Sequence, residues 1–420
     1  MAEEKRKTGT EVWGIYQNKG TEEEQNRLID EYMARRNKEI GEITVPHVGE
    51  WPPSLENWYG SQKNEYIDTD LIRHYAESMG DRNPLWLDAD YARKSGWGGI
   101  IAPPQITDSI VDSGCGRMEP EQWAKFNSFI MYPAEANHEW FIPMRPGDKI
   151  RMVQKFMGIT EVPTHFPKPC RELRLNIRKF LINQREETVA TVDHVWAFII
   201  NRPSDSKSPY KGFARGRRRL TDAERDAIQK GYDEEKRRGN KTLYWEDVKV
   251  GEESEPLIVG PISSYDTVAT YTAVAGHAVG FACQWDRIRL NTDYAWLDPE
   301  TNSWKCGGEC HIHDGHGHTE NYSKNGIAFA FKCTLYGIRA HAVTNWMGDD
   351  AFLRKMEHHV QDIVFLGEVV KTTVKVIKKY KEGNEHLVDV DVITTNPQGD
   401  LLFNGKATIK LFSKEDLTKV

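Results

Sequence analysis

The alternation of apolar and polar residues divides the chain into two similar successions of a helix followed by strands. In the first succession, apolar residues recur at helical spacing over 68–80. Asp68 or Thr69 is placed to cap this helix, and Gly80 to end it in the left-handed conformation. The runs that then alternate with a period of two are residues 138–153, 171–181 and 188–200. This order predicts a helix packed on an antiparallel sheet.

The second succession repeats the first weakly. A short apolar-faced helix is predicted over 264–276, and it again ends in glycine. The strand-like runs that follow are residues 360–376, 387–395 and 401–411. Within them Phe365-Leu366-Gly367-Glu368 falls where Arg145-Pro146-Gly147-Asp148 falls in the first succession. Self-similarity of this kind is typical of a duplicated domain.

The chain outside the two successions contains two capped helices. Thr21 and Glu24 fit a capping box before a helix to about Lys38, and Thr221 with Glu224 fits another before a helix to about Arg238. We therefore divide the chain into an N-terminal helical extension (1–57), a first domain (58–200), a linker with a basic cluster and a helix (201–241), and a second domain (242–420). The basic cluster is either a solvated linker face or a contact for phosphates of a coenzyme A nucleotide; it comprises Arg215, Arg217, Arg218 and Arg219.

Composition narrows the functional classes. A length of 420 residues favours two or more domains. The formal net charge of -7 argues against a general nucleic-acid binder, which usually carries a basic excess. Six cysteines are too sparse for a disulfide framework, so we expect a reducing, cytoplasmic setting. Neither a signal region nor a membrane-crossing run is present in the sequence, and no membrane association is expected.

One stretch of the first domain resembles the hydratase motif of the MaoC-like acyl dehydratases. It reads Gly80-Asp81-Arg82-Asn83-Pro84-Leu85-Trp86, then Asp88, Tyr91-Ala92 and Gly98-Gly99-Ile100-Ile101-Ala102-Pro103. The resemblance implies an α+β double hotdog fold, with two central helices each wrapped by an antiparallel sheet. It also implies reversible hydration of a 2-enoyl-CoA, the reverse of dehydration of a 3-hydroxyacyl-CoA, with acyl-CoA as substrate and no cofactor. The catalytic histidine of the family is replaced by Trp86.

The second domain carries the motif in altered form. Its helix ends with His277 where the family has aspartate, and His318-Thr-Glu-Asn-Tyr-Ser resembles the family's His-x-Asp-x-x-Tyr-Ala. The resemblance makes His318 the candidate catalytic histidine and the second domain the catalytic one. Its carboxylate partner is Asp314, or Asp81 if the two halves bring their sites together. The alternatives are a His318 that packs or caps a turn, and an Asp81 that only accepts backbone N–H bonds in its turn.

The resemblance also suggests residues for substrate binding. Backbone N–H groups that stabilise the thioester oxygen are expected near the Gly-rich turns. The candidates are Gly99 and Ile100 in the first domain and Gly326 and Ile327 in the second. Asn83 and Trp86 are expected to shape the acyl pocket, and the large ring of Trp86 favours a bulky acyl group.

A Cys/His-rich insertion precedes His318. Thiolate and imidazole are good zinc ligands, and the low-probability candidates for a metal site are Cys306, Cys310, His311, His313 and His316. Their spacing matches no familiar zinc module, so an exposed or pocket-lining loop is the favoured interpretation and no metal is assigned.

Two other functions remain open at this point. A hotdog thioesterase would use a carboxylate to activate water against the thioester carbonyl, and it would release free CoA. A non-catalytic subunit that supports an active hotdog partner is the third reading, because both halves depart from the Asp–His pair. A homo-oligomer such as a dimer is expected for an active enzyme of this type.

Overall fold

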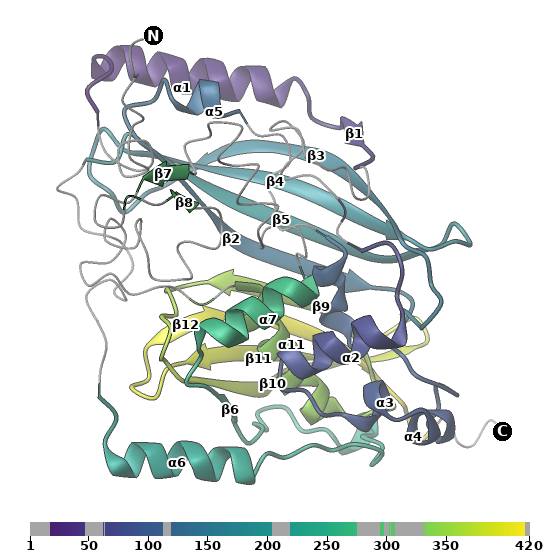
Figure 1. Cartoon of the computed structure of the whole chain (residues 1–420). Helices are drawn as coiled ribbons and strands as arrows, with labels where there is room; N and C mark the ends of the chain where they lie inside the picture. The colour runs from purple at the N-terminus through teal and green to yellow at the C-terminus, as the bar shows by residue number, and fades with distance from the viewer. Residues whose placement is uncertain are drawn as a thin grey trace.

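The structure is a computed structural model of the chain. It describes residues 17–46, 62, 64–111, 119–203, 219–274, 295–297, 302, 304–306, 330 and 332–415. Two antiparallel half-sheets, each with helices on one side, form an α+β double hotdog, as the sequence predicts (Figure 1). In the described part, no helix combines the length and the apolar character needed to cross a membrane.

The first half and the linker contain long strands preceded by short helices. The elements are α1 (Glu22–Asn37), β1 (Ile43–Thr44), α2 (Thr69–Ser78), α3 (Pro84–Leu87), α4 (Ala89–Lys94), the 3₁₀ helix η2 (Pro104–Ser109), α5 (Pro120–Trp123), β2 (Phe129–Trp140), β3 (Arg151–Val162), β4 (Arg171–Ile182), β5 (Thr188–Ile200) and α6 (Asp222–Asp233).

The second half has a similar succession, in which the 16-residue helix α11 precedes the long strands. Its elements are η4 (Trp245–Asp247), β6 (Leu257–Val259), α7 (Ser264–Val274), β7 (Ala295–Leu297), β8 (Trp304–Cys306), α11 (Lys332–Met347), β9 (Phe352–Val360), β10 (Val370–Glu382), β11 (Glu385–Thr395), β12 (Leu401–Asn404) and β13 (Lys406–Leu411).

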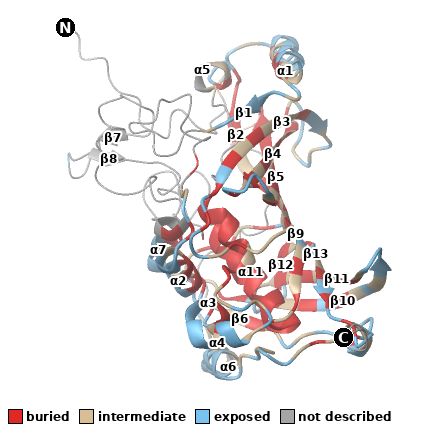
Figure 2. Ribbon diagram, turned by 90° about the vertical axis from the view of Figure 1, so that its right-hand side faces the viewer, coloured by how far each residue is buried: buried red, intermediate tan, exposed pale blue. Residues whose placement is uncertain are grey.

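Over the described residues, the two half-sheets join into one sheet of eleven strands. Its order is β1-β3-β4-β5-β2-β9-β12-β11-β10-β6, and β13 pairs with β11 and β9. The junction is the antiparallel pair β2–β9, in which Glu135 lies opposite His359 and Glu139 opposite Lys355. In β3 and β10 buried residues alternate with more exposed ones, so one face of each strand covers the core. Figure 2 shows the buried residues concentrated along the strands and α11.

Helix α11 is the central helix of the second half. Every residue from Cys333 to Met347 is buried, and the helix contacts β9, β10, β11 and β13. Helices α2 and α7, which correspond to the predicted helices 68–80 and 264–276, instead pack against each other beside it (Figure 1). A helix buried on all sides carries no amphipathic pattern, which is why the periodicity did not reveal α11.

The turn between the first two long strands has the same hydrogen bonds in both halves. The N–H of Arg145 donates to the Asp148 carboxylate at 2.8 Å, and the N–H of Phe365 donates to the Glu368 carboxylate at 2.9 Å. Gly147 and Gly367 have φ of 95° and 92°, and their N–H groups donate to residues preceding α2 and α7 respectively. The predicted internal duplication therefore extends to individual hydrogen bonds.

The two helices outside the sheets begin at capping boxes, as predicted. Thr21 pairs with Glu24 in α1, and Thr221 pairs with Glu224 in α6. The prediction for α6 is wrong at its end, because the helix stops at Asp233 rather than near Arg238. The following segment binds α11 instead: the N–H of Arg238 donates to the Asn345 carbonyl at 2.9 Å. The domain boundaries at 57/58, 200/201 and 241/242 stay predictions.

Substituting Gly405 by alanine is expected to destabilise the protein by about 2 kcal/mol or more. Gly405 has φ of 149°, and a Cβ atom there would lie 2.1 Å from the carbonyl oxygen of Glu357 on β9. Chemical denaturation measures the effect. The control is Gly96→Ala, where the nearest atom to the added Cβ is 3.7 Å away, and a change within about 0.5 kcal/mol is expected. Equal stability of the two variants would contradict the close approach.

Candidate active site

Asp81 stands just beyond helix α2, at the position that the motif assigns to the catalytic carboxylate. Gly80 ends the helix with φ of 68°, and the N–H of Asp81 bonds back to the Ala76 carbonyl at 2.9 Å. One carboxylate oxygen accepts the N–H of Asn83 at 3.0 Å, and the other accepts the indole N–H of Trp86 at 2.8 Å. The side chain is buried, with 4% of the residue exposed. These hydrogen bonds hold the carboxylate of Asp81 in one orientation. The alternative in which Asp81 only accepts hydrogen bonds within its turn expects bonds of this kind.

Residues from two other parts of the chain meet Asp81. Nε2 of His341, on α11, lies 3.7 Å from Asp81 Oδ1. A guanidinium nitrogen of Arg237, in the segment after α6, lies 3.6 Å from the same oxygen. The two halves and the linker thus contribute to one site. The sequence analysis allowed Asp81 a catalytic role only if the two halves meet in this way.

Glu235 connects these groups. Its Oε1 lies 3.0 Å from His341 Nε2 and accepts a hydrogen bond from Asn345 Nδ2 at 2.8 Å. Burial alone would raise the pKa of Glu235, but His341, Asn345 and Arg237 together lower it to about 2. Burial lowers the pKa of His341, yet the carboxylates of Asp81 and Glu235 outweigh that effect and raise it above its ordinary value. The electrostatics therefore favour an imidazolium between two carboxylates.

A small cavity of about 10 Å³ lies beside this cluster. Its wall comes from α2, the start of η2 and α11, and it includes Asp81, His341, Gln105, Tyr75 and Thr344. Among the residues that the structure describes, two buried polar atoms in this wall have no hydrogen-bond partner, namely the hydroxyl of Tyr75 and Nδ1 of His341. Buried polar atoms are rarely left unpaired, and a space of this size holds about one water-sized polar group.

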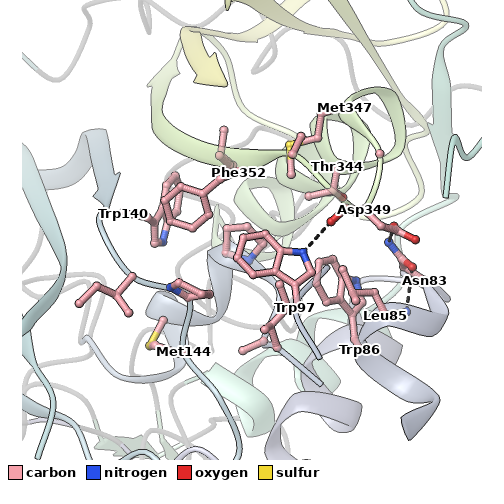
Figure 3. A pocket seen from close by; sticks show the side chains of 18 residues that line it. Asn83, Leu85, Trp86, Trp97, Trp140, Met144, Thr344, Met347, Asp349 and Phe352 are labelled. Atoms are coloured by element: carbon pink, nitrogen blue, oxygen red, sulfur yellow. Dashed lines mark hydrogen bonds between the residues drawn. The ribbon is translucent and has the colours of Figure 1, made fainter. Parts of the chain in front are cut away.

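A second, mainly apolar cavity of about 20 Å³ shares Pro104 and Thr344 with the first (Figure 3). Figure 3 shows the rings of Trp86, Trp97, Trp140 and Phe352 around it.

Asp349 holds one end of this cavity together. Its carboxylate accepts Asn83 Nδ2 at 2.9 Å and the Tyr91 hydroxyl at 2.5 Å, and its carbonyl accepts the indole N–H of Trp97 at 2.7 Å. Burial, together with the bond to Asp349, raises the pKa of Tyr91 to about 12, so Tyr91 remains a donor. Asn83 and Trp86 both line the cavity, where the resemblance places them; their part in substrate binding stays a prediction.

A second buried polar cluster crosses the junction of the two half-sheets. Arg339 Nε donates to His358 Nδ1 at 3.2 Å, and His358 Nε2 lies 3.2 Å from the amide oxygen of Gln105. The amide nitrogen of Gln105 donates to Asp108 at 3.0 Å and lies 3.0 Å from His138 Nε2. Burial raises the pKa of Asp108 to about 7 and, with the charge of Lys179, lowers that of His138 to about 3. This cluster adjoins the smaller cavity through Gln105.

The structure describes only some of the other residues that the sequence predicts for the site. Gly99 and Ile100 lie in the loop before η2, and in the described part of the chain their N–H groups have no backbone hydrogen bond. The predicted residues that lie outside the described part of the chain are His277, Asp314, His318, Gly326, Ile327, Cys310, His311, His313 and His316, together with Arg215, Arg217 and Arg218 of the basic cluster. Cys306 ends β8. Over the ranges that the structure describes, no group of three potential metal ligands comes together.

Sequence reasoning missed His341, Glu235 and Arg237. His341 lies within the helix that carried no amphipathic signal, and the segment after α6 reads as a charged linker. The one available signal was the resemblance of Thr344–Asp350 to a segment that recurs in two-hotdog proteins, which points to the end of α11.

The sequence is similar to those of known dehydratases and hydratases. Residues 57–192 match a family model described as the FAS1-like dehydratase domain region. A probable enoyl-CoA hydratase alpha subunit of Thermomonospora curvata is 24% identical over 177 residues, covering 36% of this chain and 52% of the relative. A 3-oxo-4,17-pregnadiene-20-carboxyl-CoA hydratase alpha subunit of Mycobacterium tuberculosis is 34% identical over 55 residues, covering 13% and 18% respectively.

The structural comparison concerns the fold. A solved MaoC-like dehydratase superposes with a TM-score of 0.53 at 16% identity, covering 86% of this chain and 100% of that one. The chain spans between 18% and 67% of the length of the curated relatives it matches. The chain therefore has the double hotdog fold of solved MaoC-like dehydratases, and residues 57–192, which include the motif around Asp81, are similar to the dehydratase domain region of that family model.

Proposed function

We propose that the chain adds water reversibly to the double bond of a 2-enoyl-CoA, forming a 3-hydroxyacyl-CoA. The observation that carries this proposal is the position of Asp81: the motif carboxylate lies in the wall of a cavity and within 3.7 Å of an imidazole. Hydration needs a base for the attacking water and an acid for the α-carbon, and a carboxylate with an imidazole can fill both roles.

The thioester oxygen needs hydrogen-bond donors as negative charge develops on it. The N–H groups of Gly99 and Ile100 are proposed for this role, because they lie in the loop before η2 without a backbone acceptor in the described structure. Gly326 and Ile327, outside the described residues, stay the corresponding proposal for the second half, with His318 and Asp314 as its acid–base candidates.

A bulky acyl group is the proposed substrate. The larger cavity is lined by Trp86, Trp97, Trp140 and Phe352, and flat aromatic walls suit a rigid, ring-shaped apolar group. The name of the Mycobacterium tuberculosis relative, a 3-oxo-4,17-pregnadiene-20-carboxyl-CoA hydratase alpha subunit, denotes such a group for that protein. This supports testing ring-bearing acyl thioesters first.

A second candidate function is support of a catalytic partner subunit. Trp86 replaces the family histidine and donates its N–H to Asp81 at 2.8 Å, so one carboxylate oxygen is already engaged. Two relatives are named as alpha subunits, which implies further subunits in those proteins. A homo-oligomer is the assembly proposed for the active enzyme.

The deciding experiment incubates the purified chain with 2-enoyl-CoA thioesters of short-chain and ring-bearing acyl groups. Loss of enoyl absorbance with a matching gain of 3-hydroxyacyl-CoA, and no free thiol, is the expected result. Free CoA would identify a thioesterase instead. An inert chain that gains activity only when an unrelated hotdog subunit is added would favour the supporting role.

A further inference from the structure

The imidazole nearest to Asp81 comes from the opposite half of the chain. We infer that His341 of α11 is the acid–base partner of Asp81 and that Glu235 of the linker positions its ring. This inference rests on the proposed hydratase function. It assigns the working site to the contact between the halves, whereas the sequence analysis assigned it to His318 within the second half.

Because Trp86 stands at the position of the motif histidine, the proposed reaction needs an imidazole from another part of the chain. The indole nitrogen is a donor only and does not exchange its proton near neutral pH. At 2.8 Å from Asp81 it can orient the carboxylate, but it cannot replace the histidine of the motif. Within the described residues, His341 is the histidine that comes within 4.0 Å of Asp81.

The ring of His341 is oriented for this role. Its Nε2 faces Glu235 at 3.0 Å and Asp81 at 3.7 Å, while its Nδ1 is buried and has no hydrogen-bond partner in the described part of the chain. The residue lines the same cavity as Asp81. Because Nε2 is engaged by carboxylates, Nδ1 is the nitrogen left to exchange a proton with a substrate in that cavity.

The reaction step balances with these two groups alone. Water oxygen forms a bond to C3 of the enoyl group, and the Asp81 carboxylate takes one proton of that water. The electron pair of the C2–C3 double bond moves to C2, which takes the proton from His341. Asp81 then releases its proton to solvent water, and Nδ1 of His341 takes one from solvent, which restores the starting state while Nε2 keeps its proton toward the carboxylates.

Glu235 acts on this site through His341. Besides the bond to the ring, Glu235 accepts Asn345 Nδ2 at 2.8 Å and lies 3.3 Å from an Arg237 nitrogen. These contacts fix the carboxylate against α11 and so fix the rotation of the imidazole. The charged and titratable groups facing His341 are Asp81 from the turn after α2, and Glu235 and Arg237 from the segment after α6; Tyr75 of α2 shares the cavity wall.

The test compares His341→Gln and Glu235→Gln with matched surface variants of the full chain. The controls are His74→Gln on the exposed side of α2 and Glu234→Gln at the end of α6. Hydration of the best 2-enoyl-CoA is followed as kcat/KM over pH, with thermal unfolding recorded for every variant. His341→Gln is expected to lower kcat/KM by about 10²-fold or more, and both controls to leave it unchanged.

Glu235→Gln tests whether Glu235 positions His341 or has only a structural role. Removing this carboxylate lowers the pKa of His341, so the alkaline limb of kcat/KM, which reports loss of the protonated ring, should shift to lower pH. This shift decides the matter if His341→Gln proves poorly folded.

Each other outcome overturns a defined part of the inference. Wild-type activity in His341→Gln, combined with loss of activity in His318→Ala, overturns the inference and leaves the proposed function intact. An unmoved alkaline limb in Glu235→Gln overturns the positioning role. A wild-type chain without hydratase activity overturns both the inference and the proposed function.

Discussion

Asp81→Asn is expected to lower kcat/KM for 2-enoyl-CoA hydration by about 10²- to 10⁴-fold, the range for losing a positioned acid–base group. The amide cannot accept the proton of the attacking water. It also cannot accept both the Asn83 N–H and the Trp86 indole N–H, so a loss of about 1 kcal/mol in stability accompanies the substitution. Steady-state kinetics and chemical denaturation on the same preparation separate the two effects.

The control is Asp90→Asn, since Asp90 is an exposed aspartate of α4 in the same half of the chain. It should retain wild-type kinetics and stability. Full activity in Asp81→Asn together with a loss of about 10²-fold in His318→Ala would place the working site in the second half. The reverse pattern would show that the sequence analysis assigned the two halves wrongly.

Asp108→Asn is expected to stabilise the protein at pH 8 by up to about 4 kcal/mol. Burial raises the pKa of Asp108 from 3.8 to about 7 in the folded chain. Between these two pH values the folded state holds a proton that the unfolded state has released, so wild-type stability falls as pH rises. The amide carries no charge to desolvate and can still accept the bond from Gln105.

Denaturation between pH 4 and pH 8 measures the difference. The stability of Asp108→Asn should match wild type near pH 4 and exceed it progressively up to about pH 7, where the carboxyl of the wild type ionises. Asp90→Asn should follow the wild-type curve throughout. Parallel curves for Asp108→Asn and wild type would mean that the buried carboxyl is not protonated in the folded state.

Local patterns predicted those parts of the fold that local interactions determine. The capping boxes at Thr21 and Thr221 formed as expected, Asp68 caps α2, and Gly80 ends it in the left-handed region. Strands β4 and β5 coincide with the predicted alternating runs to within one residue. Cys170 and Cys333 are both buried in the core.

The sequence predicted the site only where the residues of its motif lie close together in the chain. The turn from Gly80 to Trp86 places Asp81 through bonds within a few residues. The contact with His341 depends on how α11 crosses the end of α2, and the contact with Glu235 depends on where α6 stops. Both are tertiary features between residues far apart in sequence, and neither leaves a periodic signal in the chain.

The pairing of β2 with β9 limits how the two repeats of this protein can be separated or exchanged. Separating the two repeats would leave each with an unpaired strand edge, which readily recruits other chains. It would also divide the acid–base groups between two molecules. Gene fission or the exchange of one repeat for a foreign one would therefore have to restore a protein–protein contact in the same register before any chemistry returned.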